Sequence, residues 1–101
     1  MSIHISCYTK YSPYELQGKL NNLSEKYSDI FPLHYYLSSA VVPHPIQKEI
    51  SNEFGLEPCS YFIMSVNNKA LEISTDGIAN IIRNELGKEN VIMLLNGEDL
   101  I

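Results

Sequence analysis

Three side chains in this sequence could take part in nucleophilic catalysis: Cys59, His34 and His44. A cysteine attacks as its thiolate, which needs an electropositive and partly exposed setting. Cys59 instead opens an apolar stretch with acidic residues nearby. Proton transfer also requires the reacting groups to lie within hydrogen-bond reach or one water apart. A small enzyme that uses Cys59 and His44 is therefore the least favoured of three functions that the sequence allows.

Other patterns that carry chemistry are missing from the sequence. It has no Gly-rich phosphate loop, no nucleophile elbow and no cysteine or histidine spacing typical of zinc sites. Glu49, Glu53 and Glu72 could act as general acids or bases only in a cleft that shifts their pKa values, which a sequence cannot display. We therefore predict no catalytic residue, no metal site and no cofactor.

The charge balance disfavours nucleic acid as a partner. The 101 residues include seven Lys and Arg against twelve Asp and Glu, for a net charge of −5. Binding to a phosphate backbone requires clustered cations, and these seven are scattered along the chain. A basic protein partner is electrostatically favoured instead.

The sequence also predicts a cytoplasmic protein with no membrane contact. It has no basic start followed by an apolar core, and no run approaches 18 apolar residues. Cys7 and Cys59 lie in apolar, strand-like runs without partners at metal-binding spacing, so we expect buried free thiols. A disulfide between them would require neighbouring strands.

Two apolar runs predict the centre of a sheet. Residues Tyr61 to Val66 and Val91 to Leu95 are apolar on both alternating faces, so we expect two adjacent, fully covered strands. Asn67-Asn68 followed by Leu71 to Ser74 predicts a hairpin that begins from the first of these strands.

Two further strands are expected in the first half of the chain. Residues Ile3 to Tyr8 alternate apolar and polar, which predicts a strand with one face on the core. Leu33 to Val42 is rich in aromatic and β-branched residues and predicts another strand.

Three helices are expected between the strands. Ser12-Pro13-Tyr14-Glu15 is a helix start, and a leucine stripe extends the first helix to Tyr27. Pro45 begins a second helix that would bury Ile46, Ile50 and Phe54 and end at Gly55. Thr75 or Asp76 would cap a third helix, which Gly87 ends.

These elements predict one α+β domain over residues 1–101, with a mixed sheet of four or five strands and three helices in the order β-α-β-α-β-β-α-β. Residues 33–95 alone have the β-α-β-β-α-β order of ferredoxin-like domains. Two helices cover only one face of such a sheet. The helix from Pro13 to Tyr27, or another protein, must cover the other face.

The leading hypothesis is a small acidic inhibitor, such as an immunity protein or antitoxin that binds a basic bacterial toxin, for example a nuclease. Glu49, Glu53 and Glu57 form the most concentrated acidic surface of the chain. Tyr35 and Tyr36 point to opposite faces of their strand, so one of them could anchor an interface. The alternative is a homodimeric, ferredoxin-like regulatory or ligand-sensing module that pairs through a bare sheet face.

Overall fold

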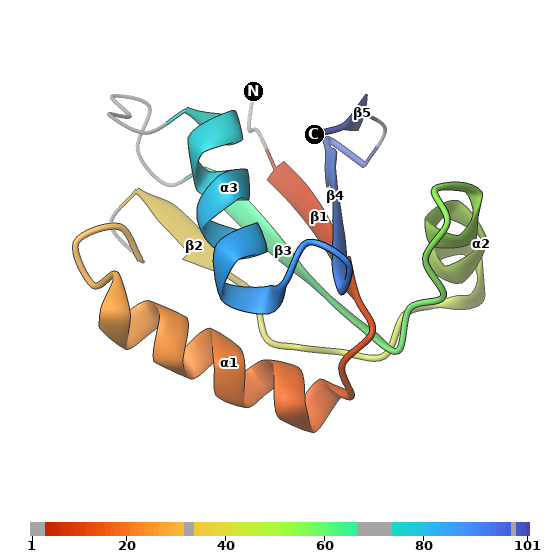
Figure 1. The fold of residues 1–101 in the computed structure, drawn as a ribbon, viewed down its shortest axis with the longest axis horizontal. Coiled ribbons are helices and arrows are strands. Elements are labelled where there is room, and N and C mark those ends of the chain that lie inside the picture. Colours follow the sequence, from red (N-terminus) through yellow and green to blue (C-terminus); the bar gives the residue numbers. More distant parts are fainter. Residues whose placement is uncertain (1–3, 32–33, 67–73, 98) are drawn as a thin grey trace.

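The computed structural model describes residues 4–31, 34–66, 74–97 and 99–101. Its elements are, in chain order, β1 (His4–Thr9), α1 (Pro13–Lys26), β2 (Tyr35–Leu37), α2 (Pro45–Glu53), β3 (Ser60–Val66), α3 (Thr75–Leu86), β4 (Val91–Leu95) and β5 (Asp99–Leu100) (Figure 1). The predicted α+β class, with three helices and a sheet of up to five strands, is confirmed.

The strands lie in the order β2-β3-β1-β4-β5, and each of the four pairings is antiparallel. The sequence predicts a mixed sheet, and this detail is wrong. The helical crossovers α1 and α3 each join two strands that run parallel but are not adjacent, because an antiparallel strand lies between them.

β1 is the centre of the sheet, which corrects the expectation that β3 and β4 lie side by side. Cys7 is paired with Phe62 of β3 on one side and with Met93 of β4 on the other. Ser6 and Tyr8, expected on a polar face, are also buried. Tyr8 packs with Leu56 and Leu94 on that face, and Ser6 lies between Ile63 and Leu94 of the two neighbouring strands.

The ferredoxin-like order is present, but it begins at β1 rather than at residue 33. Elements β1, α1, β2, β3, α3 and β4 follow the β-α-β-β-α-β order, and α2 is inserted in the connection between β2 and β3. β5, expected as a tail, pairs with the edge of β4. The inserted helix is thus the main addition to a familiar scaffold.

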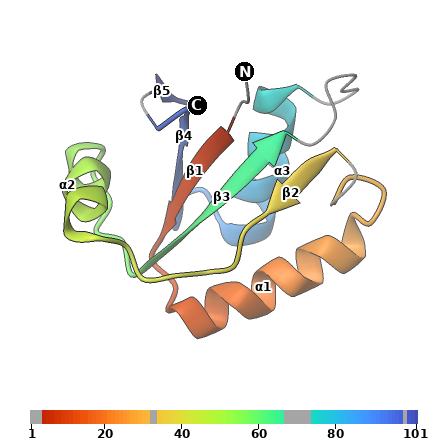
Figure 2. The same cartoon turned by 180° about the vertical axis from the view of Figure 1, so that it is seen from behind.

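Both α1 and α3 pack on the same side of the sheet, here called the first face. Their side chains form one core with Ile5, Cys7, Phe62 and Met64, and the helical members are Leu16, Leu20, Leu23, Ile78, Ala79, Ile82 and Leu86. Seen from behind, α3 lies beyond the sheet and α2 stands to one side (Figure 2). The expectation that α1 might cover the opposite face is therefore wrong, because its leucine stripe is buried beside α3.

Helix ends follow local sequence signals. The Ser12 hydroxyl accepts a hydrogen bond from the Glu15 amide at 3.2 Å, and α1 ends one residue before the predicted Tyr27. Gly87 ends α3 with φ 90°, where a side chain would approach Asn90 to 2.7 Å. The N-cap of α3 is Ser74, not Thr75 or Asp76.

The predicted strand from Leu33 to Val42 is shorter in the structure. β2 ends at Leu37, and Val41 forms a single bridge to Tyr61. Between them the Ser38 amide donates to the Ile63 carbonyl at 2.9 Å, but the Ile63 amide donates to the Ser38 hydroxyl, also at 2.9 Å, instead of to a backbone carbonyl.

The predicted hairpin falls mainly outside the described residues, which omit 67–73. Ser74, its last residue, caps α3. Near Val66, β3 is already paired with β2 on one edge and with β1 on the other. No edge of β3 is therefore left there for the second strand of a hairpin.

The register keeps the two cysteines apart. Cys7 is opposite Phe62, whereas the Cys59 amide donates to the Thr9 carbonyl at 2.8 Å. Cys59 lies three positions before Phe62, about 10 Å along an extended chain, which exceeds the Cα spacing that a disulfide can bridge. Both thiols are free, as predicted, but only Cys7 is buried and Cys59 is exposed.

We expect a thiol-reactive aromatic disulfide to label Cys59 alone in the folded protein. Burial raises the pKa of the Cys7 thiol and also blocks the reagent. Absorbance of the released thiolate should report one fast thiol per chain in buffer and a second after unfolding in guanidinium. Cys59→Ser is the control and should remove the fast reaction; rapid labelling of Cys7 would contradict the central position of β1.

Candidate partner-binding surface

The second face of the sheet, which carries Ser6, Tyr8, Tyr61 and Ile63, is covered at one end only. There Tyr8, Leu94 and Leu56 form a small buried cluster, with Ile50, Tyr61 and Ile92 packed around it. The rings of Tyr8 and Tyr61 stack with centroids 5.8 Å apart. The other end of this face has no such cluster among the described residues.

That other end is here called the open half: Tyr36, Ile63 and Ser65. Tyr36 is opposite Ser65 in the pairing of β2 with β3, so their side chains share a face. Tyr36 is 56% exposed, and Ile63 and Ser65 are partly exposed. The two halves of the second face therefore differ: one is closed by α2, and one is accessible.

The helix α2 is held against the closed half by few groups. Ser51 is its one fully buried residue, and its hydroxyl donates to the Leu56 carbonyl at 2.8 Å. The Leu56 amide donates in return to the Ser51 carbonyl at 3.2 Å. This reciprocal pair, together with the side chains of Leu56 and Ile50, anchors the helix.

The N-terminus of α2 has a capping box. His44 Nδ1 accepts from the Ile46 amide at 3.4 Å, and Gln47 Oε1 accepts from the His44 amide at 2.8 Å. Pro45 occupies the first turn as predicted. The ring of His44 thus serves the backbone of α2.

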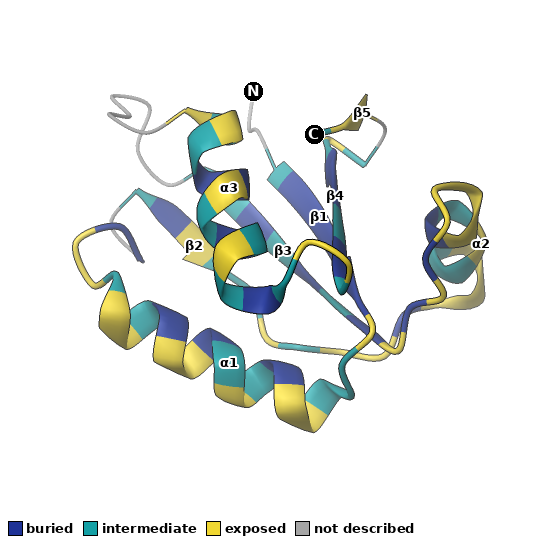
Figure 3. Ribbon diagram, in the orientation of Figure 1, coloured by how far each residue is buried: buried dark blue, intermediate teal, exposed yellow. Residues whose placement is uncertain are grey.

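The stripe of α2 predicted to be buried is largely exposed, which corrects the sequence analysis. Ile46 is 62% exposed and Phe54 is 38% exposed, and Figure 3 shows much of α2 as exposed. Because Ser51 is the buried residue of α2, the fourfold repeat of Ile46, Ile50 and Phe54 lies at the edge of the buried side rather than at its centre.

The predicted acidic residues Glu49, Glu53 and Glu57 are all exposed. Residues spaced by three or four in a helix are neighbours, so Ile46, Glu49 and Glu53 share one side of α2, here called its outer side. Lys48 lies about 100° round the helix from Glu49. The salt bridge among the described residues joins Lys26 and Glu85 at 2.6 Å, away from these carboxylates.

The two tyrosines predicted as partner contacts differ in exposure. Tyr35 is fully buried on the first face, and burial raises the pKa of its hydroxyl. Tyr36 is exposed on the second face. The expectation that they point to opposite faces is confirmed, and only Tyr36 is accessible to a partner.

The structure does not bring His34 to Cys59, as catalysis by Cys59, His34 and His44 together would require. His34 precedes β2, which pairs with the Val66 end of β3, whereas Cys59 precedes Ser60 at the other end. The seven residues of β3 span roughly 20 Å. Proton transfer between His34 and Cys59 is therefore impossible.

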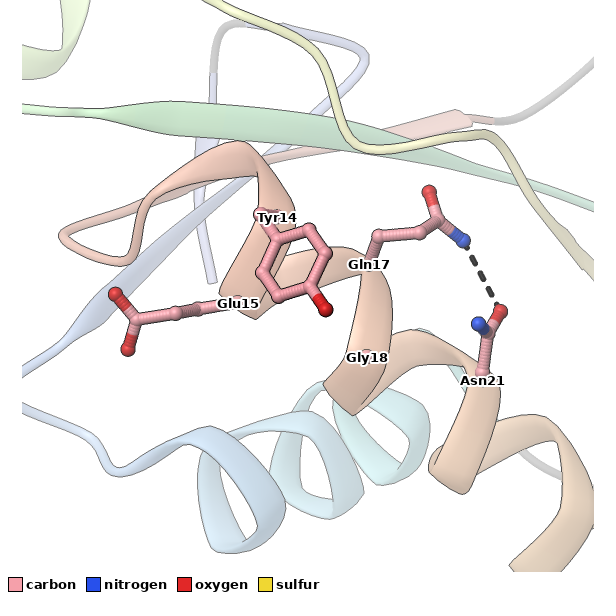
Figure 4. Close-up of a pocket in the computed structure, with 5 residues that line it drawn as sticks. All are labelled: Tyr14, Glu15, Gln17, Gly18 and Asn21. Atoms are coloured by element: carbon pink, nitrogen blue, oxygen red, sulfur yellow. Dashed lines mark hydrogen bonds between the residues drawn. The ribbon is translucent and has the colours of Figure 1, made fainter.

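One hollow, of about 310 Å³, lies on the outside of α1 (Figure 4). Its lining residues are Tyr14, Glu15, Gln17, Gly18 and Asn21, and the Gln17 amide donates to Asn21 at 3.1 Å. It brings one carboxylate to its rim and no second titratable partner from another element. In the described part of the chain, no cluster of His, Cys, Asp and Glu could hold a metal, and no helix is long and apolar enough to cross a membrane.

Comparison with known protein families identifies the family of this chain. The family model of the CDI System Immunity Component matches residues 1–99. The chain belongs to this family. An immunity component of a bacterial contact-dependent inhibition system neutralises a protein toxin and is not an enzyme, as the sequence analysis predicts.

A solved structure agrees in fold. The immunity component is similar to a chain of a "CdiA-CT/CdiI toxin and immunity complex from Burkholderia pseudomallei", with a TM-score of 0.90 and 22% identity over 97% of this chain and 95% of that chain. At this identity the likeness shows a shared fold. No curated protein matches the chain.

The anchoring of α2 can be tested by Ser51→Ala in the immunity component. This change leaves the buried Leu56 carbonyl without its donor, and should lower the free energy of unfolding by about 1–3 kcal/mol. Urea denaturation measures the loss. Ser39 is exposed and serves as the control; Ser39→Ala should change stability by less than about 0.5 kcal/mol. Equal effects of the two changes would contradict the anchor.

Proposed function

We propose that this immunity component neutralises its toxin by direct binding, through the outer side of α2 and the open half of the second face. The observation that carries the proposal is the exposure of Glu49 and Glu53 beside Ile46 on one side of α2. Charged and apolar groups together are typical of an interface rim and centre. The candidate contacts are Glu49, Glu53, Glu57 and Tyr36.

The charges favour a toxin domain with a basic surface, which fits a nuclease. The net charge is −5, and Glu49 and Glu53 add a local negative potential one turn apart on an exposed helix. Complementary potentials accelerate diffusional encounter and reject partners of like charge. We therefore assign the acids of α2 mainly to the association step.

The size of a protein interface supports including the open half. A stable complex buries about 800 Å² on each partner, drawn from about 20–30 residues. The nine residues of α2 cannot supply that area alone. Ile50 of α2 packs on the second face, so the surface around Tyr36 lies on the same side of the sheet.

The cytoplasmic site of action and the possibility of a homodimer stay predictions from the sequence. Sedimentation of the purified chain tests the second. A regulatory module that pairs through its open half would sediment as a dimer alone, whereas an inhibitor of this kind needs only a heterodimer with the toxin.

We expect the double change Glu49→Lys and Glu53→Lys to slow association with the toxin domain of the same inhibition system by at least about tenfold at low ionic strength. Salt screens exposed charges, so the difference from the wild type should shrink at high salt. Surface plasmon resonance with the immobilised toxin domain gives both rates.

Glu25→Lys is a charge-reversal control outside α2, since Glu25 is exposed on α1 at the first face, and it reverses one charge where the double variant reverses two. It changes the net charge in the same direction but should alter the association rate by less than the double variant. Unchanged association of the double variant at low salt would remove the acids of α2 from the site.

A further inference from the structure

Exposed apolar side chains gather in the segment that leads into and forms α2. Val42 is 66% exposed, Ile46 62%, Val41 42% and Phe54 38%. Four of the seven large hydrophobic residues most exposed in the described chain thus fall within 14 positions. Single exposed apolar residues are ordinary, but a local concentration marks an interaction surface.

The packing of α2 does not explain this concentration. A nine-residue helix is too short to be stable alone, so it depends on contact with the sheet. Ile50 and Leu56 already provide that contact, and the Ser51 hydroxyl ties α2 to Leu56. A helix that only closed the end of the sheet would be stabilised by turning Ile46 inward, yet Ile46 shares the outer side with Glu49 and Glu53.

We infer that Val42 and Ile46 form the apolar centre of the toxin interface, and that Glu49 and Glu53 form its charged rim. The inference rests on the proposed function and adds the chemistry of the partner. The matching patch on the toxin domain has an apolar side chain at its middle and Lys or Arg around it. Apolar contacts at the centre of an interface hold the complex together, whereas rim charges chiefly set the encounter rate.

The charges select a toxin domain over a second copy of this chain as the occupant. A symmetric contact places the same patch of both subunits face to face. Glu49 and Glu53 of one copy would then approach the same carboxylates of the other, and like charges oppose such a contact. A basic partner meets the same patch without that repulsion.

The place of α2 in the chain suits this role. It is inserted between β2 and β3, outside the core formed by α1, α3 and the first face. Its outer side can therefore vary with the toxin while the scaffold is kept. Recognition and folding are assigned to different parts of the molecule.

The test compares the wild-type chain with the double change Val42→Ser and Ile46→Ser, using the toxin domain of the same system on a biosensor. We expect dissociation to accelerate by at least about tenfold while association changes by less than about threefold. The thermal midpoint should stay close to that of the wild type, because both side chains are exposed. Glu49→Lys with Glu53→Lys should show the reverse pattern, with slower association.

Tyr14→Ser with Leu100→Ser is the matched control, since these side chains are 89% and 55% exposed on other elements. It should leave dissociation unchanged. Ile46→Leu, which keeps an apolar group, should retain most of the affinity. A double variant that dissociates like the wild type would overturn the inference, as would a wild-type homodimer that Ile46→Ser disrupts.

The outcomes separate this inference from the proposed function. If the wild-type chain does not bind the toxin domain, the proposed function fails. A second outcome is that the wild type binds while Val42→Ser with Ile46→Ser dissociates at the wild-type rate. Direct binding then stands, and the assignment of the interface centre to Val42 and Ile46 is wrong.

Discussion

The structure depends on one constraint: the central strand β1 needs cover on both faces, and the two longer helices supply it on one. Ile5 and Cys7 project into the core beneath α1 and α3, whereas Tyr8 projects to the second face. Burying apolar surface there requires another layer. The chain supplies it with a short inserted helix that closes one end of the second face and leaves the other end accessible.

This division gives the two faces different packing and exposure. The first face has a continuous core, and a salt bridge between Lys26 and Glu85 joins its two helices at their surface. The second face has a small cluster, an exposed tyrosine and an exposed acidic helix. Because the first core does not include the outer side of α2, substitutions on that side should leave the fold intact.

The sequence predicts local structure well and the assignment of faces poorly. Ser12, Pro13 and Glu15 define the start of α1, and Gly87 defines the end of α3, because caps and left-handed glycines act through adjacent backbone groups. The leucine stripe of α1 shows that one side is buried but not against which face of the sheet. Alternation likewise separates Tyr35 from Tyr36 without telling which of the two is exposed, since the answer depends on the position of α1 and α3.

The same limit explains why the acids of α2 were predicted to be exposed and its apolar residues were not. Glu49 and Glu53 are charged, and burying a charged group has a high desolvation cost. Their exposure is therefore expected whatever the tertiary contacts are. Ile46 has no such restriction, and a repeat with Ile50 and Phe54 indicates a buried stripe. The helix instead buries Ser51, because its hydroxyl satisfies the carbonyl of Leu56 in the segment that leads into β3. One buried hydrogen bond thus sets the rotation of α2, and that rotation leaves Ile46 among carboxylates at the surface. An exposed isoleucine in that setting is better explained by a partner that covers it than by the stability of the free chain.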